Sequence, residues 1–304
     1  MSDDPFEPVP GRVDTLGDGV RRIVAPNASP MTFKGTNTYI VGTDSLVVID
    51  PGPEDSQHLF AILAALDGKP VTQICVTHAH SDHSPLAASL AKETGAPIVA
   101  FGDHKAGQSA VMRRLMADGY TGGGEGIDAN FKPHIYLGDE EILASGAGPI
   151  RAIHTPGHMG NHLCFAWEDV IFSGDHVMGW ASSMVSPPDG DISDFMASCR
   201  KLQGSGATVF YPGHGAPITD PEGRLAWLIK HRSERNAQIL DHLAKGPADI
   251  ATLTGDIYAD VPRNLHPAAA RNVFAHLIGL HETGHVVATP SLSPTATFAR
   301  KPSP

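Results

Sequence analysis

The chain has 304 residues, of which 41% are hydrophobic and 18% are charged. This composition allows a buried core and excludes a protein that is disordered throughout. The formal net charge of −11 argues against a protein that binds nucleic acid over its whole surface.

Cysteine use and the first residues indicate a compartment. Cys75, Cys164 and Cys199 lie far apart without a CxxC pair, which favours a reducing environment. The segment MSDDPFEPVP is acidic and contains proline, unlike secretory or mitochondrial targeting segments. No apolar run approaches the ~20 residues of a membrane span. We therefore expect a cytoplasmic protein without a membrane partner.

The first two thirds of the chain alternates short apolar runs with amphipathic segments. Apolar runs bounded by Gly, Pro, Asp or Asn predict strands, and apolar residues three or four apart predict helices. The expected strands lie at 20–23, 38–41, 46–49, 71–76, 98–101, 135–137, 150–153, 163–167, 170–172 and 208–211, and the helices at 57–66, 85–94, 109–118 and 193–202. We expect a mobile loop at 119–126.

The remainder is mainly helical. Helices are expected at 222–243, 247–258 and 267–283, followed by a short apolar run at 286–288. Three helices and a small strand pair are typical of a winged-helix-like module. The polar, Pro/Ser-rich end is expected to be disordered. The predicted organisation is a domain at 1–220, a helical module at 221–289 and a tail at 290–304.

The charged residues are distributed unevenly between the two parts of the chain. Residues 1–199 carry 11 basic and 25 acidic groups, whereas residues 200–304 carry 11 basic and 8 acidic groups. The second part would therefore tolerate an anionic ligand, especially along Lys230, Arg232 and Arg235. The alternative interpretation of these residues is a solvated helix face.

The strongest chemical signal is the segment THAHSDHS at 77–84, which directly follows the apolar run VTQICV. It places His78, His80, Asp82 and His83 at the end of a predicted buried strand. Imidazole and carboxylate groups bind Zn²⁺ and similar divalent metals. Four such groups in one turn are too crowded for a single tetrahedral ion, so the pattern indicates two neighbouring metals.

Three later segments repeat the order of apolar strand, sharp Gly turn and ligand-type residue. HTPGH ends at His158, SGD ends at Asp175 and YPGHG contains His214. Loops that follow the strands of a rigid sheet often carry functional residues. We expect these three side chains to lie near the first four.

Together these motifs resemble the metallo-β-lactamase superfamily, whose pattern is HxHxDH, a distal His, a bridging Asp and a last His. The resemblance covers about residues 20–220. It implies an α+β fold, an αβ/βα sandwich with metals at one edge of two facing mixed sheets. It also implies that His78, His80 and His158 bind one metal, that Asp82, His83 and His214 bind the other, and that Asp175 bridges both.

Two divalent ions ~3.5–4 Å apart lower the pKa of a shared water towards ~7 and polarise a carbonyl or phosphoryl oxygen. We therefore expect a dinuclear hydrolase that uses a metal-bridging hydroxide, with Asp82 and Asp175 as catalytic residues. Zn²⁺ is the favoured metal, although His/Asp sites also accept Mn²⁺ and iron.

Several neighbouring residues have weaker signals. His154, His162 and His176 flank the ligand-type residues, and each is either a pocket-wall group or a packed, hydrogen-bonded histidine. Asp50, in the segment VVIDPGP, resembles the early Asp of the superfamily and is expected to support the ligands. Asn37 begins a strand that in this family lies near the pocket.

Other features narrow the branch of the superfamily. Asp175 stands where the β-lactamases proper carry Cys or Ser, and His80 stands where the flavin-linked diiron branch carries Glu. The segment WLIKHRSERNAQIL at 227–240 and the HPAA helix start at 266–269 are similar to the β-lactamase-like protein 2 group. A eukaryotic member of that group is associated with cleavage of single-stranded RNA.

Three functions therefore stay open. The first is phosphodiester hydrolysis of single-stranded RNA, which needs local clustering of basic residues, namely Arg200, Lys201, Arg224, Lys230, Arg232 and Arg235. The second is hydrolysis of a small ester, thioester or lactone, similar to glyoxalase II. The third is a mononuclear iron sulfur dioxygenase on the same scaffold. A homodimer is a common choice in this group.

Overall fold

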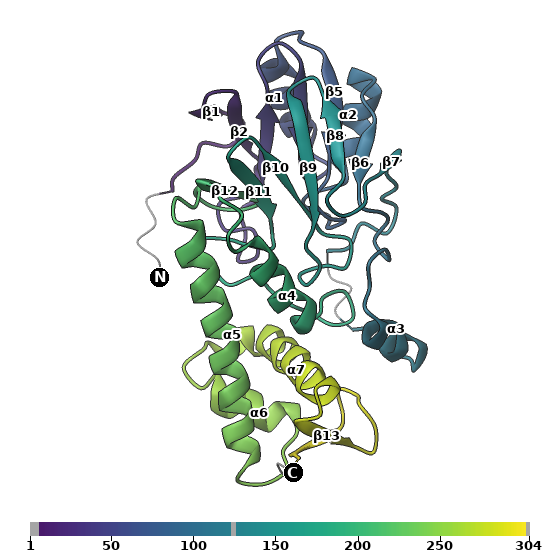
Figure 1. The fold of residues 1–304 in the computed structure, drawn as a ribbon, viewed down its shortest axis with the longest axis vertical. Coiled ribbons are helices and arrows are strands. Elements are labelled where there is room, and N and C mark those ends of the chain that lie inside the picture. Colours follow the sequence, from purple (N-terminus) through teal and green to yellow (C-terminus); the bar gives the residue numbers. More distant parts are fainter. Residues whose placement is uncertain (1–5, 123–125, 302–304) are drawn as a thin grey trace.

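The computed structural model describes residues 6–122 and 126–301, and its main part is a sandwich of two β-sheets (Figure 1). The first sheet has the strand order β1-β2-β3-β4-β5-β6-β7. Its strands are β1 Val13–Gly17, β2 Val20–Val24, β3 Asn37–Val41, β4 Leu46–Ile49, β5 Val71–Cys75, β6 Ile98–Ala100 and β7 Ile135–Tyr136. Strands β1 to β4 pair antiparallel, and β4 to β7 pair parallel, so the sheet is mixed.

The second sheet has the order β12-β11-β10-β9-β8. Its strands are β8 Ile142–Ser145, β9 Gly148–His154, β10 Leu163–Trp167, β11 Val170–Gly174 and β12 Val209–Pro212. Only the β11–β12 pair is parallel. Strands β5, β9, β11 and β12 all end immediately before a segment that carries ligand-type residues, so the architecture brings those segments towards one edge.

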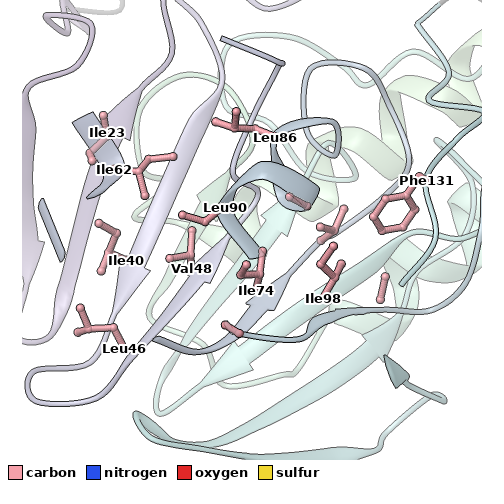
Figure 2. Close-up of a cluster of buried hydrophobic side chains, with 14 of the residues drawn as sticks. Ile23, Ile40, Leu46, Val48, Ile62, Ile74, Leu86, Leu90, Ile98 and Phe131 are labelled. Atoms are coloured by element: carbon pink, nitrogen blue, oxygen red, sulfur yellow. The ribbon is translucent and has the colours of Figure 1, made fainter. Parts of the chain in front are cut away.

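Helices cover the outer faces of both sheets. Helices α1 Ser56–Leu66 and α2 Leu86–Thr94 pack on the first sheet, where Ile62 and Leu90 meet apolar strand residues such as Ile40 (Figure 2). Helix α4 Ile192–Leu202 packs on the second sheet through Phe195. A separate cluster, which includes Phe165, fills the space between the sheets. These αβ/βα layers confirm the predicted fold class.

A C-terminal module follows the sandwich and lies below it in Figure 1. It consists of α5 Pro221–Leu243, α6 Ile250–Ile257, the 3₁₀ helix Arg263–Leu265, α7 His266–Glu282 and the hairpin β13 Val286–Thr289 and β14 Thr297–Arg300. Helix α3 Ala110–Ala117 leaves the sandwich to pack against this module through Leu115. Because the first turns of α5 pack with the second sheet through Leu225, the domain division at residue 220 stays a prediction.

The prediction that residues 290–304 form a disordered tail is wrong for residues 290–301, the part of this segment that the structure describes. Strand β14 pairs antiparallel with β13, and the Phe298 side chain is fully buried in the module core. The backbone of Phe298 also exchanges hydrogen bonds of 2.8 and 3.0 Å with Ala248. One buried aromatic ring and its strand pairing fix a segment whose composition suggested disorder. Residues 302–304 lie outside the described range.

Other differences from the sequence prediction are small. Strands β1 and β8 were not expected; β1 has no buried residue and β8 is a short strand with one buried residue, Leu143. Of the loop predicted at 119–126, residues 123–125 lie outside the described residues. Within the described ranges, no helix is both long and apolar enough to cross a bilayer.

Candidate metal centre

Three histidines form one group at the edge of the sandwich. His78 and His80 come from the loop after β5, and His158 comes from the loop after β9. The Nδ1 atom of His80 lies 2.9 Å from His78 Nε2 and 3.0 Å from His158 Nε2. One proton on these three nitrogens cannot make good hydrogen bonds to all of them, so at least one lone pair stays unpaired. A metal ion at the centre could accept all three lone pairs.

Backbone and side-chain partners fix the orientation of two of these rings. His158 Nδ1 lies 2.7 Å from the carbonyl oxygen of Met184. A carbonyl only accepts, so Nδ1 carries the proton and Nε2 presents a lone pair. His78 Nδ1 lies 2.9 Å from Thr77 Oγ1, whose hydroxyl donates to a carboxylate. That hydroxyl can therefore accept from His78 Nδ1, which leaves Nε2 free as well.

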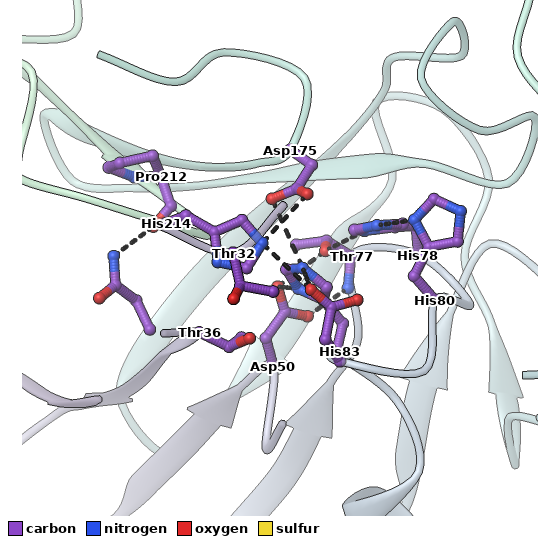
Figure 3. A network of polar contacts seen from close by, with 12 residues as sticks. Thr32, Thr36, Asp50, Thr77, His78, His80, His83, Asp175, Pro212 and His214 are labelled. Carbon is purple, nitrogen blue, oxygen red and sulfur yellow. Dashed lines mark hydrogen bonds and ion pairs between the residues drawn. The ribbon is translucent and has the colours of Figure 1, made fainter. Parts of the chain in front are cut away.

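A second group lies beside the first and contains two histidines and two aspartates (Figure 3). One ligand-type atom each of Asp82, His83, Asp175 and His214 lies within 4.8 Å of the other three. His214 Nε2 is 3.1 Å from Asp82 Oδ2, and its Nδ1 donates to the carbonyl oxygen of Gly35 at 3.1 Å. This group therefore offers ring nitrogens and carboxylate oxygens to one point.

Asp175 faces both groups. Its Oδ2 lies 3.3 Å from His214 Nε2 and 3.8 Å from His158 Nε2, and its Oδ1 lies 3.4 Å from His83 Nε2. The short turn at the end of β11 positions this carboxylate, and its backbone N–H donates to His162 Nε2 at 3.2 Å. The Asp175 carboxylate therefore lies between His158 of the first group and the two histidine rings of the second group.

Asp50 supports residues of both groups from beneath. Its Oδ1 accepts from the Thr77 N–H and its Oδ2 from the Thr77 hydroxyl, both at 2.7 Å, and Oδ2 lies 2.9 Å from His83 Nδ1. The residue has a positive φ of 50°, an uncommon conformation for a non-glycine residue. Its three acceptor contacts hold the carboxylate in this conformation at the end of β4.

Buried polar atoms without a hydrogen-bond partner indicate whether the site fits a metal ion. Among the described residues, the buried atoms without a hydrogen-bond partner include His83 Nε2, His214 Nε2 and Asp175 Oδ1. Unpaired buried polar atoms are costly. All three point into the second group, and a divalent cation at their centre would satisfy them together. The donor set of imidazoles and carboxylates therefore fits a divalent metal.

The pKa values of the two groups move in opposite directions. Burial, and then the neighbouring His158, lower the pKa of His80 to about 3. Burial also lowers the pKa of His214, but the neighbouring carboxylates of Asp175 and Asp82 outweigh it and raise the pKa to about 9. The rings of the first group are thus neutral near pH 7, whereas the carboxylates of the second group favour positive charge beside them, which a divalent cation could supply in place of ring protons.

Small residues allow the ligand-type side chains to approach one another. A Cβ atom at Gly213 would lie 2.3 Å from Asp175 Oδ1 and 2.6 Å from His83 Cε1. Gly157 has a φ of 142°, and a Cβ there would lie 2.3 Å from the Cα of Phe195 in α4. These glycines keep the loops before His214 and His158 close to their neighbours.

The three histidines that flank the ligand-type residues have different surroundings in the structure. His154 stacks on Phe101, with ring centroids 3.8 Å apart, and its Nε2 contacts the Gly160 carbonyl oxygen at 2.9 Å, so it is a packed histidine. His162 contacts the Asp175 backbone as described above and supports the site. His176 is buried with its Nε2 3.5 Å from Cys199 Sγ, so it is a packed histidine.

Several supporting groups were not singled out in the sequence. The carbonyl oxygen of Met184 orients His158, and a backbone carbonyl leaves no residue-type signal; the Gly35 carbonyl that orients His214 belongs to the turn 35–36, which the superfamily resemblance placed near the pocket. Gly213 stands directly before His214 in YPGHG, and this position could have indicated tight packing. Asn37, expected near the pocket, donates to the carbonyl oxygens of Pro212 and Gly215 at 2.9 Å and braces the turn around His214.

Comparison with known proteins agrees with this fold and site. The profile "Metallo-beta-lactamase superfamily" matches residues 31–214, and the profile "Beta-lactamase associated winged helix domain" matches residues 250–293. The chain belongs to the metallo-β-lactamase superfamily.

The particular relatives extend this result over almost the whole chain. A "Beta-lactamase-like protein 2 homolog" from Drosophila melanogaster is 30% identical over 284 residues, which cover 90% of this chain and 91% of the relative. An "Atrochrysone carboxyl ACP thioesterase" from Aspergillus terreus is 30% identical, covering 77% of this chain and 66% of the relative. A beta-lactamase domain protein from Burkholderia ambifaria has the same fold, with a TM-score of 0.79 at 21% identity, covering 98% of this chain and 96% of that one.

Proposed function

We propose that this chain is a dinuclear metal-dependent hydrolase of an acyl ester or thioester. Its first ion is held by His78, His80 and His158, its second by Asp82, His83 and His214, and Asp175 lies between them. The observation that carries the proposal is the position of Asp175, whose carboxylate faces nitrogen atoms of both groups. The completeness of the second group favours two ions over the single iron of a dioxygenase.

When bound, two divalent ions supply Lewis acidity to an acyl carbonyl and lower the pKa of water. The protein's own residues set the geometry for this reaction. Asp175 is nearly buried and holds negative charge between the cation positions, whereas the side chain of Asp82 is 23% exposed. Asp82 is therefore the carboxylate that substrate and solvent reach, and it can accept a hydrogen bond from an attacking water.

The basic residues argue for an acyl substrate over an RNA backbone. Arg224 donates to the carbonyl oxygens of Met178 and Ala181, both at 2.7 Å. Lys201 forms an ion pair with Asp139. Much of a protein's affinity for nucleic acids comes from basic side chains that neutralise phosphates. Basic side chains that are already bonded to groups within the chain are poor candidates for this role.

Three of the four remaining members of the basic set are also buried or paired within the chain, and only Arg200 is simply exposed among the described residues. Arg232 is 2% exposed. Arg235 donates to Gln238 and to the Ile257 carbonyl oxygen. Lys230 is exposed and lies 3.8 Å from Glu234, as expected for a solvated helix face. The name of the Aspergillus terreus relative, a thioesterase, supports the same substrate class.

A substrate panel tests this proposal directly. The metal-loaded protein is incubated with acyl thioesters, aryl esters and lactones, with and without a chelator, beside labelled single-stranded RNA. We expect chelator-sensitive hydrolysis of at least one acyl class, lost in Asp175→Ala. Cleavage of RNA without acyl turnover would reject the acyl assignment and favour the phosphodiesterase. Elemental analysis of freshly purified protein separates both from the dioxygenase, which would contain one iron per chain.

A further inference from the structure

The first helix of the C-terminal module contacts the segment that follows Asp175. Two arginines of α5, Arg224 and Arg232, are eight residues apart, which places them about two turns apart on one side of the helix. Arg224 donates to the carbonyl oxygens of Met178 and Ala181. Arg232 donates through Nη2 to the carbonyl oxygen of Ser183. The segment 178–184 is therefore attached to α5 along its length.

Arg232 is held in place from several sides. Its Nη1 donates to Asn272 Oδ1 of α7 at 3.2 Å, and its guanidinium lies 5.3 Å from the ring centroid of Phe195 in α4. The residue is 2% exposed, and burial lowers its pKa to about 10, so it stays charged near pH 7. A buried charge costs free energy unless its partners are well placed. Here they belong to two helices, α4 and α7, and to the loop that contains Ser183.

The carbonyl group next to the one that binds Arg232 orients a ligand-type histidine. Ser183 accepts from Arg232, and Met184 accepts from Nδ1 of His158 at 2.7 Å. The two carbonyls lie in adjacent rigid peptide planes joined by φ and ψ of Met184, so a shift of the Ser183 carbonyl displaces the Met184 carbonyl unless these two torsions compensate. The Ser183 hydroxyl also donates to the His176 carbonyl oxygen at 2.9 Å, which limits other movements of this turn.

We propose that Arg232 is a positioning residue for the three-histidine group. By fixing the Ser183 carbonyl, it holds the Met184 carbonyl in the direction that keeps the proton of His158 on Nδ1 and its Nε2 lone pair facing His78 and His80. The C-terminal module thereby sets the metal affinity of one group without contacting the ion. This inference rests on the metal-binding part of the proposed function.

Metal titration tests the inference without any substrate. Apo-protein is titrated with Zn²⁺ against a chromophoric chelator, and the binding step that His80→Ala abolishes identifies the three-histidine site. We expect Arg232→Met to weaken that step at least 10-fold, a size typical of partners that orient metal ligands. The other step should change less than 3-fold. Arg232→Lys should restore part of the affinity, because an ammonium can still donate to a carbonyl.

Matched variants control for general damage. Lys230→Met removes a neighbouring cation from the exposed face of α5 and should titrate like the parent. If Arg232→Met fails to fold, Asn272→Ala is used in its place. This variant removes the acceptor of Arg232 Nη1 and should weaken the same binding step severalfold. Parent-like binding in both variants, or equal weakening of both steps, would overturn the inference. A parent that binds no metal would instead reject the proposed function itself.

Discussion

The carboxylate of Asp50 lies 2.9 Å from Nδ1 of His83 and, through the Thr77 hydroxyl, also reaches His78. A single buried acid thus orients one ring in each of the two groups. Within residues 6–122 and 126–301, its side-chain hydrogen bonds are with Thr77 and His83, so its influence on the two groups is exerted through ring orientation and tautomer. This link couples the two candidate metal positions through the protein.

Replacement of Asp50 by Asn tests that link. Asn keeps the size of the side chain but loses one of the two acceptor oxygens that serve Thr77 and His83. We expect Zn²⁺ affinity to fall about 10–100-fold at both positions, as for other groups that orient metal ligands. Asp44→Asn, at an exposed position, should bind like the parent. Unchanged affinity in Asp50→Asn would show that this contact is dispensable.

Gly213→Ala tests the spacing between the loops that carry the site. The added Cβ would meet Asp175 Oδ1 at 2.3 Å, so the carboxylate must move. Since a displacement near 1 Å can cost about 100-fold in rate, we expect turnover to fall by about that factor.

A control for Gly213→Ala is Gly255→Ala, which lies in α6 with no atom within 4 Å of the new Cβ. It should keep full activity and raise the free energy of unfolding by up to about 1 kcal/mol, because alanine favours the helix. Similar activity in the two variants would contradict the assigned packing.

Phe298→Ala tests whether the C-terminal hairpin belongs to the module core. The Phe298 side chain is fully buried, and removing such a ring costs about 3 kcal/mol or more in the free energy of unfolding. Guanidinium unfolding followed by circular dichroism measures the loss. Val287→Ala, on β13 with 40% of the residue exposed, should cost less than about 0.5 kcal/mol. Equal midpoints for the two variants would mean that the hairpin adds no stability.

Asp194 gives a pH-dependent prediction away from the metal centre. Burial, and then the nearby Asp191, raise its pKa to about 6. A carboxyl group with a raised pKa contributes its full stability below its unfolded pKa near 3.9, and this contribution disappears as pH rises through 6. After discounting for partial exposure, the change is about 1 kcal/mol.

The comparison of parent and Asp194→Asn isolates this effect. The unfolding free energy at pH 4 minus that at pH 7 should be about 1 kcal/mol more positive in the parent than in the variant, because Asn does not titrate. An identical pH dependence in both proteins would show that Asp194 has an ordinary pKa in the folded state.

Local patterns in the sequence predicted most of the strands and helices and the residues that meet at the edge of the sheets, whereas the sandwich architecture was implied by the resemblance to the superfamily. THAHSDHS places four ligand-type residues directly after the apolar run VTQICV, and such a motif indicates a metal site without any tertiary context. The later His158, Asp175 and His214 follow strands of the second sheet and arrive at the same edge. The resemblance to a known superfamily supplied the pairing into two groups, which spacing alone did not.

The remaining features depend on contacts between distant segments. The partner of His214 is a carbonyl oxygen 179 residues away, and the partner of Arg232 lies 49 residues away. Arg232 has the same local pattern as a solvated basic residue, yet it is buried because α4 and α7 close over it. The strand at Thr297–Arg300 was missed for a related reason, since one buried Phe298 outweighs a polar composition.

Anomalous diffraction from crystals of the Zn²⁺-loaded protein tests the central claim most directly. The account predicts two peaks, one among His78, His80 and His158 and one among Asp82, His83 and His214, with Asp175 in contact with both. A single peak, or zinc bound elsewhere with these side chains unchanged, would contradict a dinuclear centre.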